Sequence, residues 1–439
     1  MHRDDPVEYE PVSVKAVLAE MKDTAELLID LSYSAVLHGS PDLAKEVLAL
    51  ESRMDVLQLQ ARMSVMMAAR SPEDVEDLAP VLGVVGAAEK VSDAAGDIAK
   101  VVLEEVGLPE AMRAALPEAV ESLVRAPVAD DSAYVGRTLA GINMETETGV
   151  RVIAVRRDQA TGKARWITNP GRDTEFRAGD TLILRGFEEG LREVYEAAAG
   201  EPYEVPTPPD PAVEDLERAV DSIVLMKNMS ELAVDLAYGA VLFDSRGVAK
   251  EVAELEAEVD ALKSRFEAWT LRAAARVDDP VSLRGLVHLA AATEEISDAA
   301  LEISEGVLRG LEAHPVVAEA VEESDEIIVR IVVGEDSELT GATLGDREVK
   351  TETGMRVIAV RRGGTDADGD DAETDEGGDD AETDKGKDGS DDDGSGEWVV
   401  SPSARTRLRA GDVLIAKGTR AGAERLTALA GAPEEFDVD

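Results

Sequence analysis

The chain has 439 residues, with 93 acidic and 45 basic side chains and a formal net charge of −48. A surface this acidic repels nucleic acid, so we expect no nucleic-acid partner. The absence of cysteine excludes disulfides, thiolate metal sites and a cysteine nucleophile, and four histidines argue against a multi-histidine metal site.

The acidity is spread over the whole chain, and only 13 of the 45 basic residues are lysine. One interpretation is an acidic interaction surface. The interpretation we favour is adaptation to molar salt, where the screening length falls to about 3 Å and charge repulsion is short-ranged. The sequence is therefore expected to come from a halophile.

The first predicted elements are long helices. Apolar residues recur every three or four positions from Val17 to Leu31, which predicts an amphipathic helix. A second helix is expected from Leu43 to about Arg70 with Asp42 as its cap. A third begins at Pro72 after Ser71, and a further one runs through Glu89 to Val106. Long antiparallel helices of this kind form bundles.

Strands follow the helices. The segments 149–157, 164–170 and 180–186 are rich in β-branched and aliphatic residues, which predicts a small sheet. A helix at 187–200 closes the unit. Later in the chain, the β-branched run at 327–333 predicts another strand.

The same pattern then returns. "TETGVRVIAVRR" at 146–157 recurs at 351–362 as "TETGMRVIAVRR", and the 205-residue offset holds without a gap from Met21 to Arg157. Trp166 matches Trp398 at an offset of 232, so the second copy has gained 27 residues. The sequence is therefore a tandem duplication, joined by the proline-rich linker 200–212.

The gained residues lie in segment 363–397. It holds 16 acidic residues and contains "GDDAETD" twice. Such a segment cannot bury enough apolar surface to offset the entropy of ordering, so we expect a disordered acidic loop. A calcium-binding loop is less favoured, since the segment lacks flanking helices and the ligand spacing of that motif.

The strand-rich half of each copy resembles the TrkA-C (RCK-C) domain. The resemblance is carried by the G-x-T-L motif with the run that follows it, and by a final R-A-G-D motif. In copy one these are Gly136 to Leu139, Thr148 to Arg156 and Phe176 to Gly186; in copy two, Gly341 to Leu344, Thr353 to Arg361 and Leu408 to Gly418. The helical halves resemble PhoU-type bundles.

Together the two resemblances imply an α+β fold in which PhoU-like bundles alternate with small TrkA-C-type α/β domains. The predicted domains are 12–112 and 213–315 for the bundles, and 117–199 and 322–431 for the TrkA-C-like units. Because TrkA-C domains pair, the two units are expected to form a pseudo-dimer, within one chain or in a homo-oligomer.

TrkA-C domains regulate cation channels and transporters and bind small ligands, cyclic di-AMP among them, where two domains meet. The resemblance thus implies a regulatory subunit of potassium or other cation transport, with a membrane channel or transporter as partner. The alternative that the PhoU resemblance implies is a regulator of phosphate uptake acting through protein contacts. The chain lacks a G-x-G-x-x-G motif, so NAD or ATP binding through a Rossmann unit is not expected.

In dinucleotide-binding members an Asn-Ile-Arg run precedes the repeated strand. The matching residues are Asn143 to Glu145 in copy one and Glu348 to Lys350 in copy two, so only Lys350 retains a cation for a phosphate. The resemblance implies a cyclic-dinucleotide site, with candidate residues Asn143, Arg151, Lys350 and Arg356. The alternative is that the strand arginines Arg151, Arg156, Arg356 and Arg361 face solvent and pair with nearby carboxylates.

Carboxylates four residues apart recur on the predicted helices and would share a helical face. PhoU-like bundles hold metal clusters with such pairs, which implies sites for a divalent metal with oxygen ligands. The candidate pairs are Glu26 and Asp30, Glu89 and Asp93, Glu231 and Asp235, and Glu294 and Asp298, together with Glu51 and Asp55 and their counterparts Glu256 and Asp260. Chance is the alternative, because about a fifth of the residues are acidic.

Three observations bear on enzyme activity and location. His38, His288 and His314 have no counterpart in the other copy and no nucleophile motif accompanies them, so we do not expect an enzyme. No stretch approaches 18 uninterrupted apolar residues, so no membrane insertion is expected. The N-terminal segment does not resemble a signal peptide, which predicts a cytoplasmic protein, peripheral at the membrane through a transporter partner.

Overall fold

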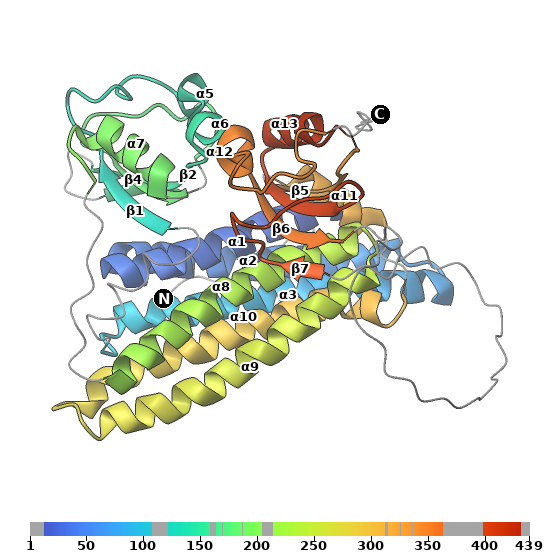
Figure 1. The fold of residues 1–439 in the computed structure, drawn as a ribbon. Helices are drawn as coiled ribbons and strands as arrows, with labels where there is room; N and C mark the ends of the chain where they lie inside the picture. Colours follow the sequence, from blue (N-terminus) through green and yellow to red (C-terminus); the bar gives the residue numbers. More distant parts are fainter. Residues whose placement is uncertain are drawn as a thin grey trace, which may run out of the picture.

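The computed structural model describes residues 13–107, 122–158, 164–168, 170–186, 188–203, 214–311, 315–324, 326–335, 337–362 and 398–431. The predicted acidic loop 363–397 and most of the predicted linker lie outside these residues. The described part consists of two helical bundles and two small antiparallel sheets (Figure 1). The predicted α+β fold class is confirmed.

Each bundle contains three long helices. In copy one they are α1 (Val14–His38), α2 (Pro41–Ala68) and α3 (Pro72–Leu103). In copy two they are α8 (Glu214–Leu242), α9 (Arg246–Ala274) and α10 (Arg284–Leu308), with the short 3-10 helix η2 (Pro280–Leu283) before α10. The bundles pack together along α3 and α10, so their buried alanine, valine and leucine side chains form one continuous core.

Two helix boundaries differ from the prediction. The cap of α2 is Ser40, whose hydroxyl accepts from the Leu43 backbone N–H at 3.3 Å, while Asp42 lies inside the first turn. Pro41 explains this, because a proline at the first helical position has no N–H to satisfy. The two helices predicted after Ser71 are one helix, α3, which continues through Pro80. Its packing against α1, α2 and α10 outweighs the missing backbone hydrogen bond.

The two sheets have the same topology. In copy one, β1 (Ser122–Pro127), β2 (Arg151–Asp158), β3 (Ala164–Thr168) and β4 (Thr181–Gly186) lie in the order β1-β4-β2-β3. In copy two, β5 (Ile327–Val332), β6 (Met355–Arg361), β7 (Trp398–Val400) and β8 (Val413–Gly418) lie in the order β5-β8-β6-β7. β2 and β6 each carry an irregularity in their pairing with the neighbouring strand, at the equivalent residues Ile153 and Ile358.

Short helices cover the outer face of each sheet. Copy one has α5 (Leu139–Ile142), α6 (Met144–Thr148) and α7 (Glu188–Ala199); copy two has α12 (Val349–Thr353) and α13 (Arg420–Ala430). Glycine permits their close packing, because a Cβ at Gly190 would lie 2.1 Å from the Thr148 carbonyl oxygen. Gly422 meets the Thr353 carbonyl in the same way in copy two, at 2.6 Å. The duplicated glycines thus fix α6 and α12.

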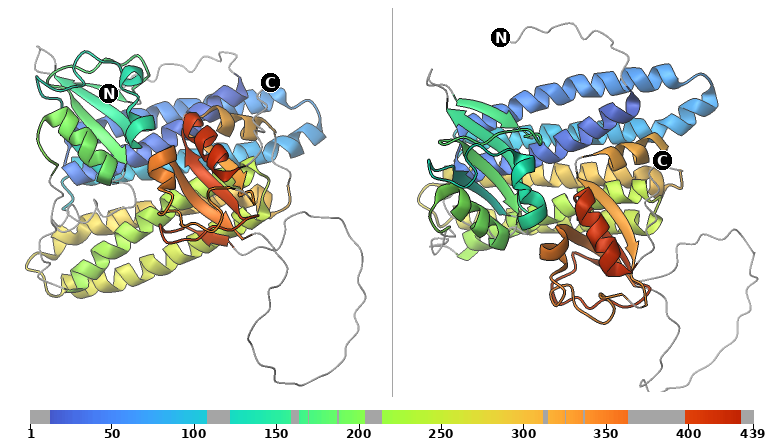
Figure 2. Two further views of the ribbon diagram at one scale, coloured as in Figure 1. Left: turned by 45° about the horizontal axis from the view of Figure 1, so that its top comes forward. Right: turned by 90° about the horizontal axis from the view of Figure 1, so that it is seen from above.

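The inner face of each sheet packs on the helical layer. Ile153 and Ile183 of copy one, and Ile358 and Ile415 of copy two, join the helical core. A further helix, α11 (Pro315–Glu323), packs against α1 and leads into β5. Both sheets lie on the same side of the helices, with α6 facing α12 (Figure 1; Figure 2 gives two further views). Among the described residues, no helix is both long and apolar enough to cross a membrane.

Candidate functional site

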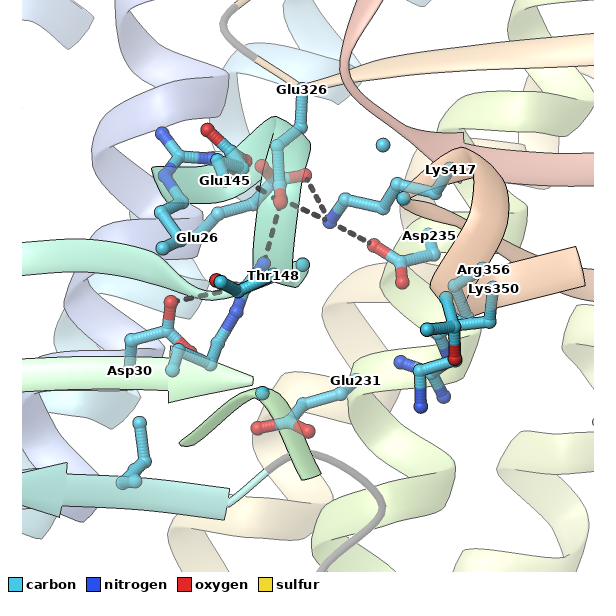
Figure 3. A pocket seen from close by; sticks show the side chains of 18 of the residues that line it. Glu26, Asp30, Glu145, Thr148, Glu231, Asp235, Glu326, Lys350, Arg356 and Lys417 are labelled. Carbon is cyan, nitrogen blue, oxygen red and sulfur yellow. Dashed lines mark hydrogen bonds and ion pairs between the residues drawn. The ribbon is translucent and has the colours of Figure 1, made fainter. Parts of the chain in front are cut away.

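A cavity of about 280 Å³ lies where the two sheet domains meet the helices α1 and α8 (Figure 3). Both copies contribute to its wall, including Glu145 and Arg151 from copy one and Lys350 and Arg356 from copy two. The two sheet domains are close here, since a Cβ on Gly354 would lie 3.7 Å from the Glu145 carbonyl oxygen. One chain therefore encloses a space between its own two halves.

The helices below the cavity are related by an approximate two-fold axis. The ammonium group of Lys22 on α1 lies 5.6 Å from the ring centre of Tyr238 on α8. Lys227 on α8 lies 5.1 Å from the ring centre of Tyr33 on α1. These residues are equivalent at the 205-residue offset, so each copy places its lysine on the tyrosine of the other, an attractive cation–π contact.

The last strand of each sheet is tied to the helix beneath it by a buried ion pair. Arg185 on β4 lies 2.6 Å from Asp30 on α1. At the equivalent position of copy two, Lys417 on β8 lies 2.6 Å from Asp235 on α8. A charged hydrogen bond of this kind fixes each sheet against its helix.

Glu326, which directly precedes β5, joins the two halves. Its carboxylate lies 2.6 Å from Arg185, 3.2 Å from Lys417 and 3.3 Å from Arg151. It therefore binds two cations of copy one and one of copy two, and Figure 3 shows its contact with Lys417. The residue at the matching position of copy one is Glu121, which lies outside the described residues.

A second carboxylate completes the network. Glu26 on α1 lies 2.9 Å from Lys22 and 3.2 Å from Lys417. The Lys22 ammonium group also donates to the Glu326 backbone carbonyl at 3.3 Å, and its side chain is 2% exposed. Buried charges require such partners, because an isolated ion in the interior costs several kcal/mol.

Burial and neighbouring charges shift the pKa values of Glu326 and Lys417 in opposite directions. Burial raises the pKa of Glu326, but Arg185, Lys417 and Arg151 outweigh it and hold that pKa well below its ordinary value. Burial lowers the pKa of Lys417, but Asp235, Glu26 and Glu326 raise it well above its ordinary value. Both groups are therefore charged at neutral pH.

Asp30 behaves differently. Burial raises the pKa of its carboxyl group to about 6, because the nearby charge of Arg185 only partly offsets the loss of hydration and Glu231 and Glu326 add repulsion. The contact between β4 and α1 thus contains a group that titrates in mildly acidic solution.

The predicted ligand residues are partly brought together. Arg151, Lys350 and Arg356 line the cavity. Asn143 lies outside this wall, in a left-handed backbone conformation, and its side-chain amide donates to Glu147 at 3.1 Å. Arg151 pairs with a carboxylate, Glu326, as the alternative for the strand arginines expected, but its side chain is only 20% exposed. A dinucleotide site stays a prediction.

Two of the predicted metal pairs lie in the ion network. Glu26 and Asp235 contact Lys417, Asp30 contacts Arg185, and Glu231 pairs with Lys227. A metal ion there would have to displace cations of the chain itself, so we regard these pairs as structural.

Residues of the other predicted pairs gather in two partly exposed clusters on the bundles. Asp55 lies with Glu89 and Asp93, and Glu256 lies with Asp260 and Asp298; within each cluster, one oxygen from each residue lies within 4.8 Å of the others. Glu294 instead pairs with Lys263 at 2.6 Å. Carboxylate oxygens suit hard divalent cations, and a metal site on either bundle stays a prediction.

Sequence reasoning missed five residues of the network: Lys22, Lys227, Glu326, Arg185 and Lys417. A signal was available for the first two, because both copies keep a lysine at this position of an apolar helix in a chain with few lysines. Arg185 and Lys417 likewise interrupt matched apolar strands.

Comparison with known families supports the sequence resemblance. The TrkA-C domain model matches residues 123–199, and the PhoU domain model matches residues 18–102 and 223–307. The two PhoU matches correspond to the two bundles. The second sheet domain has the topology of the first. No curated protein matches the chain at a significant level.

Solved structures give weaker likenesses. PhoU from Pseudomonas aeruginosa is 12% identical, with a TM-score of 0.38, and the match covers 68% of this chain and 96% of that one. The GsuK RCK domain is 14% identical, with a TM-score of 0.17, over 71% of this chain and 63% of that one. The GsuK channel bound to NAD is 13% identical, with a TM-score of 0.16, over 71% and 53%. The family matches carry the assignment: the chain contains two PhoU domains and a TrkA-C domain, both domains of regulatory type.

Proposed function

We propose that the chain is a regulatory subunit of potassium or other cation transport that senses a small ligand in the cavity between its two halves. The TrkA-C match supports a role in cation transport, since domains of this family regulate cation channels and transporters. The observation that carries the proposal is the wall of the cavity, which combines both sheet domains with α1 and α8. A ligand bound there would contact all four domains.

The ion pairs suggest how binding would be transmitted. Arg185 and Lys417 each join a sheet to a helix, and Glu326 joins both cations. A charged ligand that competes for one of these groups favours a different arrangement of sheet and helix. Binding then shifts the population toward that arrangement, to the extent that the ligand binds it more tightly.

The charge of the wall limits the ligand. Nine acidic and six basic side chains line the cavity, so their formal charges sum to −3. Polyanions are therefore disfavoured except near Lys350 and Arg356, and Glu145 repels them on the opposite side. A cyclic dinucleotide would accordingly bind weakly, at one site per chain, with its phosphate near Lys350.

Regulation of phosphate uptake is the second candidate function. The observation that favours it is the double PhoU match, which accounts for both bundles. Such a regulator would act through contacts of its helices with another protein.

Transport measurements distinguish the two candidates. A strain that lacks this chain is compared with the same strain complemented by it, and rubidium uptake, as a proxy for potassium, is measured beside phosphate uptake. The proposal predicts altered rubidium uptake and unchanged phosphate uptake. The opposite result would establish the phosphate regulator, and unchanged uptake of both ions would contradict both candidates.

A further inference from the structure

An apolar stripe runs along the side of α2 that faces away from the core. Val56 is 38% exposed, Leu59 44%, Met66 65% and Met67 63%. With the half-buried Met63, these side chains follow a spacing of three and four residues, so they share one helical face. The buried residues Met54, Leu57, Ala61 and Val65 occupy the opposite face. Figure 2 (right) shows α2 along one edge of the helical layer. Exposed apolar patches of this kind mark interaction sites.

The charge around this stripe is unusual for the chain. Although 93 of 439 residues are acidic, no aspartate or glutamate occurs between Asp55 and Glu73. The same stretch contains Arg62 and Arg70. The Arg62 side chain is exposed and makes no hydrogen bond or ion pair with the residues that the structure describes. The part of α2 that follows Asp55 is therefore apolar and weakly basic in an otherwise acidic protein.

Copy two provides an internal reference. At the 205-residue offset, Val56, Leu59 and Met63 correspond to Ala261, Ser264 and Ala268, all of them exposed on α9. Arg62 corresponds to Glu267, and Met67 to Arg272. The apolar residue is kept only at Met66, where copy two has the exposed Leu271. The equivalent helix thus tolerates a polar face, so the bundle fold does not require the stripe of copy one.

We propose that this stripe on α2 is the docking surface for another protein, whose contacting element is an amphipathic helix with acidic edges. The spacing of three and four residues matches the way an apolar helix face packs against another helix. Methionine side chains are unbranched and polarisable, so they adapt to a partner's shape. Arg62 selects a carboxylate at the partner's edge. Self-pairing of the chain is disfavoured, because it would supply arginines rather than carboxylates along those edges.

The test uses fluorescent helical peptides of about 18 residues, long enough to present several turns. One peptide carries leucines along one face with glutamates at its edges, and the other replaces those glutamates with lysines. Fluorescence anisotropy measures binding to the full chain, in KCl at which circular dichroism shows a folded protein. We expect one acidic peptide to bind per chain, and the lysine peptide to bind roughly tenfold more weakly or worse.

Variants that copy the second half of the chain locate the site. Val56→Ala/Leu59→Ser/Met63→Ala should weaken binding of the acidic peptide roughly tenfold or more. Arg62→Glu alone should weaken the acidic peptide and reduce its advantage over the lysine peptide. The reciprocal change Ala261→Val/Ser264→Leu/Ala268→Met controls for nonspecific stickiness by creating a similar face on α9. All these positions are exposed or half-buried, so the fold should be retained, which circular dichroism checks.

Several results would overturn the proposal. They include no binding of the acidic peptide, equal binding by the triple variant, and preference for the lysine peptide. Light scattering that shows a wild-type dimer, lost in the triple variant, would identify the stripe as a contact between two copies. Binding to anionic lipid vesicles that the triple variant loses, without peptide binding, would assign it to a membrane surface instead.

Discussion

Copy one presents Glu145 to the central cavity where copy two presents Lys350, whereas Arg151 and Arg185 match Arg356 and Lys417, which carry the same charge. The contacts below the cavity are nearly symmetric, because each copy places its lysine on the other's tyrosine and ties its last strand to its own helix. The duplication has thus preserved the buried contacts, while the cavity wall differs in charge between Glu145 and Lys350. The difference indicates that the two halves form one asymmetric site rather than two equal ones.

The largest expected effect comes from removing the group that joins the copies. Glu326→Gln leaves Arg185, Lys417 and Arg151 without their shared carboxylate, and loss of one partner of a buried ion pair costs about 3 to 5 kcal/mol. Urea unfolding followed by circular dichroism measures the loss. Glu214→Gln, which breaks an exposed pair with Arg218, is the matched control and should change the free energy of unfolding by less than about 0.5 kcal/mol. Equal effects of the two variants would refute the joining role of Glu326.

Asp30→Asn gives a pH-dependent effect. The carboxyl group of Asp30 has a folded pKa of about 6, above its ordinary value of 3.8, so the folded state binds this proton more tightly than the unfolded state. Its contribution to stability is therefore greatest below pH 4 and is lost as the pH rises through 6. The loss amounts to roughly 3 kcal/mol.

Because asparagine does not titrate, the stability of Asp30→Asn relative to the wild type should increase between pH 4 and pH 7. Unfolding curves of both proteins across this range measure the difference, and other titrating groups largely cancel. A constant difference would show that Asp30 titrates normally.

A smaller effect is expected where one copy has a hydrogen bond that the other lacks. Thr293 donates to the Leu289 carbonyl at 2.6 Å, so the Tyr33 hydroxyl donates to Thr293, at 2.7 Å. Copy one has Ala88 at the position of Thr293. Thr293→Ala makes the copies alike and leaves the Tyr33 hydroxyl unpaired, at a cost of about 1 to 3 kcal/mol. The double variant Tyr33→Phe/Thr293→Ala should recover part of this loss, and no recovery would argue against the hydrogen bond.

The smallest effect on stability is expected from changing the connection between β6 and β7, which differs most between the two copies. β6 ends at Arg361 and β7 begins at Trp398, and these two residues pair with each other. In copy one, residues 159–163 connect the equivalent strands. Deleting residues 365–395, or replacing 363–397 with the copy-one connection, should leave the thermal midpoint in high salt nearly unchanged. A large loss of stability would mean that the acidic segment packs against the protein or binds an ion.

The sequence predicted the features that depend on local pattern. Apolar spacing placed α1, and the 205-residue offset predicted its counterpart α8 and a second sheet like the first. It did not predict that Glu26 and Asp30 pair with lysine and arginine, because the spacing of two carboxylates says nothing about cations from a strand more than 150 residues away. The cap at Ser40 was missed because the neighbouring Asp42 satisfied the same capping rule. The clustering of Asp55 with Glu89 and Asp93 required the packing of α2 on α3.

The asymmetric site between the copies is tested most directly by calorimetry with cyclic di-AMP in molar KCl. The account predicts weak binding at one site per chain, reduced by Lys350→Glu roughly ten- to a hundredfold, as expected for a lost charge-assisted hydrogen bond of about 1.5 to 3 kcal/mol. Glu145→Lys, which gives both copies a cation, should strengthen binding. Two equal sites that Lys350→Glu leaves unchanged would contradict the account, and the absence of heat at every concentration would exclude this dinucleotide as the signal.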